Sequence, residues 1–240
     1  MTATAPAVDH PRSPQWQRSA VPLLRFTLVR AAWFWAAVTV VMSIVLFTIS
    51  SFVAPEMSVV AFGHHAALWF QLAISCGLVA FCFPMHVAHG MTRRSFAQAG
   101  LIVAAITSLV YSVAMTTLLV LERSMYQENG WFHGLDSVPG VTVMSAGVAP
   151  YLWGVLMLFA AGSFSGLLVA AVYYRVGGWW GTALLPLTLA PLLLIATVAL
   201  DPITQWRPWN FGPAFSEPWQ PVLGVAVLAV AAIAFYLVVR

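Results

Sequence analysis

The sequence contains no lysine, and it carries little charge of either sign. Its charged residues are ten arginines and seven acids, which make up 7% of the 240 residues. A soluble globular chain usually carries about 25%. Hydrophobic residues reach 61%, and the mean hydropathy is +0.89. A chain so poor in charge cannot form a water-soluble surface, and the composition predicts an integral membrane protein.

Other absences exclude classes of chemistry. Without lysine there is no P-loop, whose lysine contacts the phosphates of a bound nucleotide, and no HExxH zinc motif occurs. Every aspartate and glutamate lies at or beyond the end of an apolar run, so the mid-membrane acids that proton-coupled transporters use are missing. Cys76 and Cys82 are the only cysteines, and they lie in one apolar run, where they do not indicate a redox compartment.

Six apolar runs are present, each long enough for a helix to cross a hydrocarbon layer of about 30 Å. Within lipid every backbone amide needs a partner in its own segment, so we expect the runs to be helices. They cover residues 31–52, 66–87, 100–121, 149–174, 182–200 and 221–239. The fifth is the shortest and contains Pro186 and Pro191, so we expect a kink in it.

The arginines give the expected orientation. If the N-terminus is cytoplasmic, eight arginines lie inside and two outside, which is the bias of the positive-inside rule. The inner ones are Arg12, Arg18, Arg25, Arg30, Arg93, Arg94, Arg175 and Arg240, and the outer ones are Arg123 and Arg207. The sequence therefore predicts a multi-pass protein of the cell membrane, with both termini in the cytoplasm and no cleaved signal peptide.

The predicted organisation has two parts: a cytoplasmic tail with an interfacial helix (1–30) and a six-helix transmembrane domain (31–240). The long connections 122–149 and 201–221 are expected outside the cell. The connection 175–181, RVGGWWG, is expected to be a glycine turn between interfacial tryptophans on the inner side.

The segment 14–30, which precedes the first apolar run, carries Arg18 and Arg25 seven residues apart, on one face of a helix. We interpret it as an interfacial helix on the cytoplasmic leaflet, broken or started near Pro22. The alternative is a basic tail held only by lipid charge.

The third apolar run carries a polar stripe along one helical face. Its residues are Thr107, Ser108, Tyr111, Ser112 and Thr116. The stripe is explained by interhelical hydrogen bonds, each worth about 0.6 kcal/mol. It is also explained by a substrate path or a subunit interface, and both interpretations stay open.

In the fourth run, the string GSFSG (162–166) is similar to the serine motif of intramembrane proteases. No histidine follows His133, so a serine on this run has no base on a later helix. Gly162 and Gly166, four residues apart, instead indicate a seam of close helix packing.

His86 and His89 are spaced three residues apart and could share a metal ion or a haem edge. Such a site needs ligands from other helices, and the other apolar runs contain no histidine. We therefore predict no metal site and interpret these histidines as interfacial polar residues.

The connection between the second and third runs, HGMTRRSFAQAG (89–100), is the most informative stretch. Gly90 is expected to break the preceding helix, Thr92 to cap a new one, and Gly100 to provide a second break. The predicted short helix would carry Arg93 and Arg94, with the ring of Phe96 free to insert into a partner.

The string Gly90-x-Thr92-Arg93-Arg94-x-Phe96 resembles the signature of six-helix permeases of ABC exporters, the type-2 group. In that family this loop forms a coupling helix seated in a groove of a separate ATPase. The predicted N-terminal helix resembles the family's elbow helix, and the link between the last two runs resembles an external region that often holds re-entrant turns. The larger external loop at 122–149 and the bare second cytoplasmic loop depart from the best-known members.

The resemblance implies a transport subunit that binds a separate ATPase and a second permease copy or sister chain. ATP and Mg²⁺ would be bound by the partner, and the chain itself would hold no cofactor and no catalytic residue. The aromatic external loops and uncharged runs suit a hydrophobic or amphipathic cargo. Two other functions stay open. One is a membrane enzyme or redox subunit using His86, His89 and either His133 or Asp136. The other is a non-transporting scaffold or immunity protein.

Overall fold

The computed structural model describes residues 14–55, 58–131, 148–199 and 219–240, and within these ranges every regular element is a helix. The elements are α1 (Gln15–Ser50), α2 (Val59–Gly77), the π-helical turn η1 (Leu78–Cys82), α3 (Phe83–Ala88), α4 (Arg93–Glu128), α5 (Val148–Ala183), α6 (Leu185–Ala199) and α7 (Gln220–Val239). The predicted all-helical class is confirmed. Most of the two predicted external connections, with His133 and Asp136, lies outside the described ranges.

Five of the described helical stretches are long and apolar enough to cross a membrane. They begin at Gln15, Phe62, Arg93, Tyr151 and Pro221. The predicted fifth run corresponds to α6, which has 15 residues and is apolar but shorter. The composition and the helices together support a multi-pass membrane protein.

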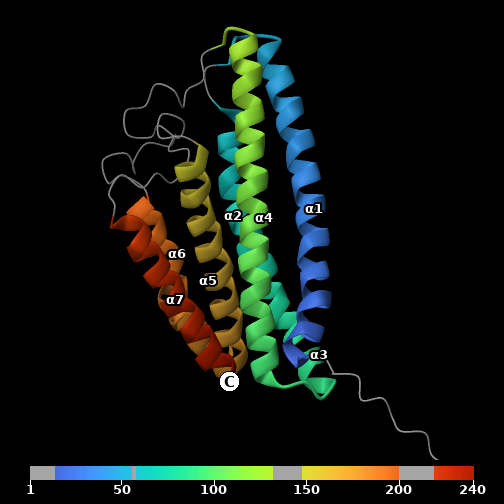
Figure 1. The fold of residues 1–240 in the computed structure, drawn as a ribbon, viewed down its shortest axis with the longest axis vertical. Coiled ribbons are helices and arrows are strands. Elements are labelled where there is room, and N and C mark those ends of the chain that lie inside the picture. The colour runs from blue at the N-terminus through green and yellow to red at the C-terminus, as the bar shows by residue number, and fades with distance from the viewer. Residues whose placement is uncertain (1–13, 56–57, 132–147, 200–218) are drawn as a thin grey trace, which may run out of the picture.

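The helices form one elongated bundle in which α1 and α4 stand side by side along the long axis (Figure 1). Helix α5 is central, because it packs against α2, α4, α6 and α7. In its most apolar stretch 78% of the residues are buried inside the chain, against 6% in α1. Helix α1 therefore presents most of its apolar surface outwards, as a helix in contact with lipid or another chain does.

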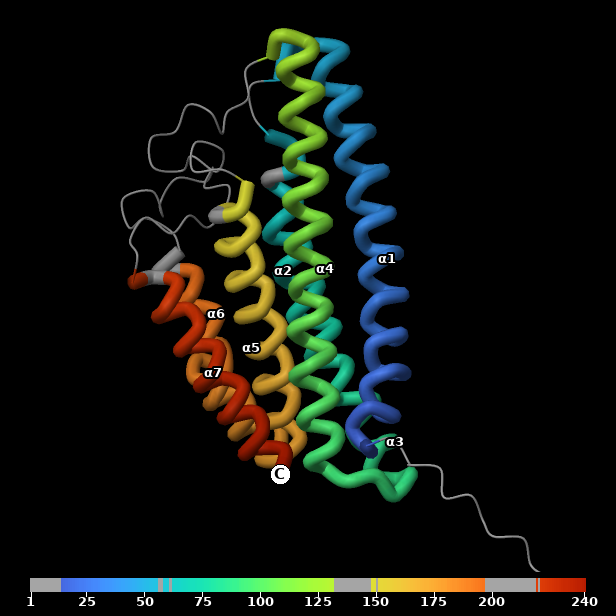
Figure 2. The backbone as a smooth tube through the Cα atoms, in the orientation of Figure 1, coloured from blue at the N-terminus to red at the C-terminus, as the bar shows by residue number. Residues whose placement is uncertain are grey.

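Two predicted helix breaks are absent. Helix α1 runs without interruption from Gln15 to Ser50 and includes Pro22, so the prediction of a separate interfacial helix before the first span is wrong. Helix α4 is likewise continuous through Gly100, as its unbroken tube shows (Figure 2). Gly100 faces the Phe235 ring of α7 at ordinary van der Waals distance, so it lies at a contact between helices instead of a break. The short coupling helix predicted before it is the first part of α4.

The proline and glycine positions account for the other irregularities. Pro84 lies in the first turn of α3, directly after η1, and its missing N–H cannot continue the α-helical bonding of α2. Gly177 has φ 82° and ψ 176°, so the chain turns there, as the RVGGWWG string predicts. Pro186 lies in the first turn of α6, where no helical N–H bond is lost, and only Pro191 is inside that helix.

Candidate functional site

The turn between α3 and α4 has a defined conformation. Gly90 has φ +73°, the left-handed region that glycine adopts without strain. Its N–H donates to the Val87 carbonyl at 3.0 Å, and the Met91 N–H donates to the His86 carbonyl at 3.2 Å. This pair of bonds is the Schellman arrangement that ends a helix, so the predicted break at Gly90 is confirmed.

Thr92 begins the next helix. Its side-chain oxygen accepts the Ser95 N–H at 3.2 Å, and its backbone is extended, as is usual for an N-cap. The Thr92 hydroxyl also donates to Oε1 of Gln15, the first residue of α1, at 3.1 Å. The turn is therefore held from two sides, by its own helix and by the start of α1.

Arg93 and Arg94 occupy the first turn of α4, and both are exposed. Cations are unfavourable at a helix N-terminus, where the backbone dipole is positive, so this placement is not explained by helix stability. Among the described residues the acidic side chains are Glu122 and Glu128, which lie about 42 Å or more further along the same helix at 1.5 Å per residue. The arginine pair is thus presented to solvent, lipid or a partner.

Phe96 does not have the position expected for a partner-binding ring. It is 0% exposed and lies 5.0 Å from the Phe83 ring and 5.3 Å from the His86 ring, measured between centroids. The prediction that Phe96 inserts into a partner is therefore wrong in this conformation. Phe96 instead packs the start of α4 against α3.

His86 takes part in the same packing. Its Nε2 lies 3.1 Å from the Ser95 hydroxyl, so the side chain is engaged within the chain. His89 is bonded through Nδ1 to the Met85 carbonyl at 2.6 Å. Across the parts of the chain that the structure describes, no three His, Cys, Asp or Glu side chains are grouped as metal ligands.

The polar stripe of α4 faces the interior of the bundle, and its five residues are all buried. They are Thr107, Ser108, Tyr111, Ser112 and Thr116. Thr107 is 3.3 Å from the Thr27 hydroxyl of α1, while Ser112 and Thr116 donate to carbonyls one turn earlier in α4. Of the two interpretations that the sequence leaves open, this geometry supports hydrogen bonding between and within helices.

A polar cluster that the sequence analysis missed joins this stripe to α2 and α5. Gln71 Nε2 donates to the Ser108 hydroxyl at 2.9 Å and to the Ser163 hydroxyl at 2.6 Å, and the two hydroxyls lie 3.1 Å apart. Gln71 Oε1 is buried and has no hydrogen-bond partner. The cluster borders a cavity of about 10 Å³, which is close to the space of one water molecule. The signal was available, because Gln71 is the only amide in its apolar run.

Gly162 and Gly166 lie where α5 meets α2. A Cβ atom on Gly166 would be 2.4 Å from the Leu72 carbonyl oxygen, and one on Gly162 would be 2.7 Å from the end of the Leu68 side chain. The Cys76 thiol donates to the Gly166 carbonyl at 3.2 Å. This is the close approach expected of a small-residue seam.

A buried carboxylate lies near the other end of α4. Glu122 is 3% exposed and accepts hydrogen bonds from the Ser58 hydroxyl, from the Val59 N–H at 2.7 Å and from the Val60 N–H at 3.0 Å. These donors form the start of α2, where a negative charge is favourable. Glu122 therefore fastens α2 to α4, a role that its position at the end of an apolar run did not indicate.

No protein-family model, no curated protein and no solved structure matches this chain.

Proposed function

We propose that the chain is the transmembrane permease subunit of an ATP-driven exporter of the ABC type, which moves a hydrophobic or amphipathic substrate across the cell membrane. The observation that carries the proposal is the exposed arginine pair in the first turn of α4, held by the Gly90 turn and the Thr92 cap. A separate ATPase binds ATP and Mg²⁺ and hydrolyses the nucleotide. A second permease subunit, identical or homologous, completes the path.

The proposal includes six spans with both termini in the cytoplasm. In its support, helical hydrogen bonding continues after the turn at Gly177: the Leu184 N–H donates to the Trp180 carbonyl and the Thr188 N–H to the Leu184 carbonyl, each at 3.0 Å. Residues 178–199, which are helical except for the turn at Leu184, then span about 33 Å at 1.5 Å per residue, enough for a sixth crossing. An even number of spans keeps the arginines near both chain ends on the inner side.

The docking surface is the turn itself, Gly90 to Arg94, instead of a helix lying along the membrane. Arg94 makes charge-assisted bonds to carboxylates of the ATPase, and Arg93 beside it adds positive charge to the docking surface. Thr92 fixes their direction because it caps α4 and is bonded to Gln15. A displacement of this turn by the ATPase would be transmitted to α4, because Phe96, near the start of that helix, is buried.

A pull-down from native membranes in mild detergent tests the proposal. Wild type is compared with Arg94→Glu and with Arg93→Glu/Arg94→Glu, and partners are identified by mass spectrometry after crosslinking. We expect an ATPase to be recovered with wild type and lost with both variants. Arg25→Glu is the matched control, because Arg25 is also exposed but lies on α1, away from the turn.

Each variant is first checked for insertion into the membrane at wild-type level. Absence of any ATPase from the crosslinked wild-type sample would refute the proposal. Equal recovery with wild type and with the double variant would refute the assignment of the docking turn.

A further inference from the structure

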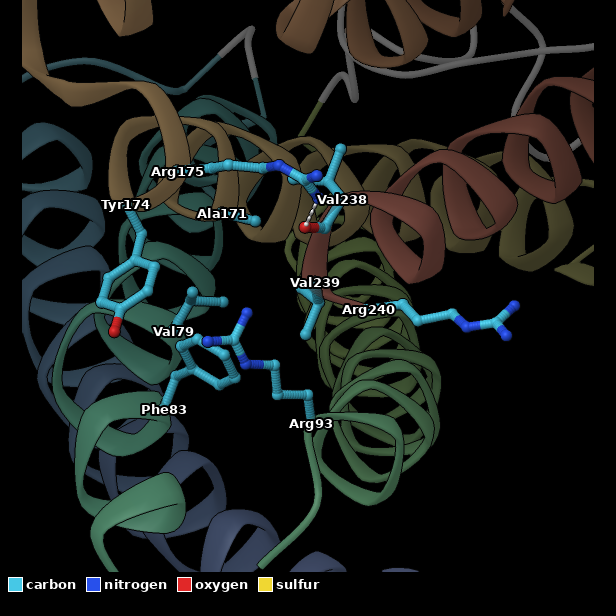
Figure 3. A pocket seen from close by; sticks show the side chains of 9 residues that line it. All are labelled: Val79, Phe83, Arg93, Ala171, Tyr174, Arg175, Val238, Val239 and Arg240. Atoms are coloured by element: carbon cyan, nitrogen blue, oxygen red, sulfur yellow. Dashed lines mark hydrogen bonds between the residues drawn. The ribbon is translucent and has the colours of Figure 1, made fainter.

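A cavity of about 300 Å³ opens at the end of the bundle where α4 begins and α7 ends. Its walls come from η1, α3, α4, α5 and α7, so five elements meet there (Figure 3). Val79, Phe83 and Val238 supply apolar walls, and Arg93 and Arg175 supply positive charge. The third arginine of the lining, Arg240, points away from the cavity in Figure 3.

Arg93 and Arg175 approach the cavity from different helices. The guanidinium of Arg93 extends from the start of α4 toward Phe83 and the interior of the cavity (Figure 3). Arg175, on α5, donates one N–H to the Val238 carbonyl at 2.8 Å, near the end of α7. A guanidinium has five N–H donors, so this single bond fixes the direction of Arg175 and leaves the others for a ligand.

The described residues offer no acidic side chain to balance these charges. The acidic residues in the described ranges are Glu122 and Glu128. Both lie near the opposite end of α4, about 44 Å or more from Arg93 along the helix. Guanidinium groups that line one cavity from two different helices are suited to a phosphate or carboxylate group. The cavity therefore fits an anion.

An apolar groove of about 560 Å³ runs between α5, α6 and α7 and reaches Val238, beside the cavity. Val238 lines both the groove and the cavity, and Val172, which lines the groove, is one helical turn before Arg175. Along α7 the groove extends from Leu223 to Val238, about 22 Å at 1.5 Å per residue. Among the described residues that line the groove, Thr188 alone has a polar side chain.

The length of the groove exceeds one half of a hydrocarbon layer of about 30 Å, so it can hold an acyl chain that enters from one leaflet. A free inorganic anion would use only the positively charged cavity and would leave the neighbouring apolar groove empty. The charge and the groove together suit an amphipathic molecule with a phosphate headgroup.

We propose that an anionic phospholipid binds here, with its phosphate between Arg93 and Arg175 and one acyl chain in the groove between α5, α6 and α7. The site belongs to this chain alone and does not depend on an ATPase. It also separates the two adjacent arginines: Arg93 faces the lipid phosphate, while Arg94 lies outside the cavity lining.

Lipid binding to the purified chain tests the proposal. The bound lipid is counted by native mass spectrometry, and the shift of the unfolding temperature is measured on adding each probe. The probes are long-chain phosphatidylglycerol, short-chain phosphatidylglycerol, phosphatidylcholine and inorganic phosphate. We expect a bound lipid and a raised unfolding temperature only with long-chain phosphatidylglycerol.

Five variants locate the site. Arg175→Gln and Arg93→Gln are each expected to weaken long-chain phosphatidylglycerol binding about tenfold or more, because each removes a charge-assisted contact, whereas Arg94→Gln leaves binding unchanged. Ala226→Trp fills the groove and removes acyl-chain binding, while Ala229→Trp, on an exposed position of α7 outside the groove, does not.

Three results would overturn the proposal: an equal response to phosphatidylcholine, an equal response to inorganic phosphate, or unchanged binding by Arg93→Gln and Arg175→Gln. If Ala226→Trp fails to fold, hydrogen exchange of wild-type residues 223–239 gives the answer. Protection by long-chain phosphatidylglycerol supports the groove, and unchanged exchange refutes it. If Arg94→Glu loses ATPase recovery but still binds lipid, the lipid site and the ATPase docking surface are independent of each other.

Discussion

Replacement of Gly166 by alanine should separate α2 from α5 and destabilise the chain. The added Cβ would lie 2.4 Å from the Leu72 carbonyl oxygen and 2.9 Å from Ser75 Cβ. Real Cβ atoms essentially never come closer than 3.0 Å, so the helices must move apart by about 0.6 Å at this point. A gap of that size forfeits about a quarter to a half of the local van der Waals attraction. We expect a loss of about 2–3 kcal/mol of unfolding free energy.

Two other glycines of α5 provide graded controls. Gly162→Ala should cost less, about 1 kcal/mol, because its Cβ meets only the flexible end of Leu68 at 2.7 Å. The Cβ added by Gly178→Ala would have no neighbour within 4 Å. This variant should be as stable as wild type, or more stable by about 0.5–1 kcal/mol, because alanine lowers the conformational entropy of the unfolded chain. Unfolding in detergent measures the three differences.

A second readout follows from the Cys76 thiol, which donates to the Gly166 carbonyl. Movement of α5 away from α2 breaks that bond, so Cys76 should react faster with a thiol reagent in native Gly166→Ala than in wild type. A Cys82→Ser background makes Cys76 the only reactive thiol. If Gly166→Ala is as stable as Gly178→Ala and its thiol reacts no faster, the close contact between α2 and α5 does not exist as described.

Three further predictions concern polar contacts. Glu122→Gln should lower the unfolding free energy by about 2–4 kcal/mol in thermal unfolding, because a neutral amide cannot accept all the bonds from the start of α2; an equal effect of the exposed Glu128→Gln would refute this. Thr92→Ala should cost about 1 kcal/mol and Thr92→Ser much less, measured in the same way, and an equal cost would exclude a capping role. Gln71→Leu should change the unfolding free energy by no more than about 1 kcal/mol. Its two serine partners still bond to each other, and an unpaired buried oxygen is removed. A loss above about 2 kcal/mol would mean that this oxygen has a bound water as its partner.

Local signals in the sequence were sufficient for the turn before α4. The break at Gly90 and the cap at Thr92 depend on backbone conformations and hydrogen bonds among neighbouring residues. Gly177 was predictable for the same reason. Five of the six apolar runs were also readable as membrane-spanning helices, since the length of a span follows from the bilayer thickness.

Where the sequence analysis failed, packing between distant segments decided the outcome. Gly100 looked like a break, but it lies in a helix and faces Phe235, about 135 residues away in the chain. Phe96 looked available, but α3 folds back and covers it. Pro22 was expected to interrupt α1, yet the helix passes through it. A pattern within one segment cannot specify which other segment will lie against it.

The same limit applies to the polar residues. The stripe on α4 was visible in the sequence, but its partners Thr27 and Ser163 lie on two other helices. Arg175 looked like an ordinary inner-side arginine, and only the arrival of α7 beside α5 gives it a carbonyl to bind and a cavity to line. Chemistry shared between helices becomes visible only when the helices are placed together.

Because α4 is one continuous helix, it can transmit a rigid-body tilt from one of its ends to the other. Its 36 residues measure about 54 Å at 1.5 Å per residue, well beyond the thickness of a hydrocarbon layer. A tilt of about 5° would displace one end by about 5 Å relative to the other on that length. The arginine pair lies at one end of α4, and Glu122 is hydrogen-bonded to the start of α2 near the other end. A small rotation of α4 that begins on one side of the membrane would therefore move the start of α2 on the opposite side, with no helical turn unfolding.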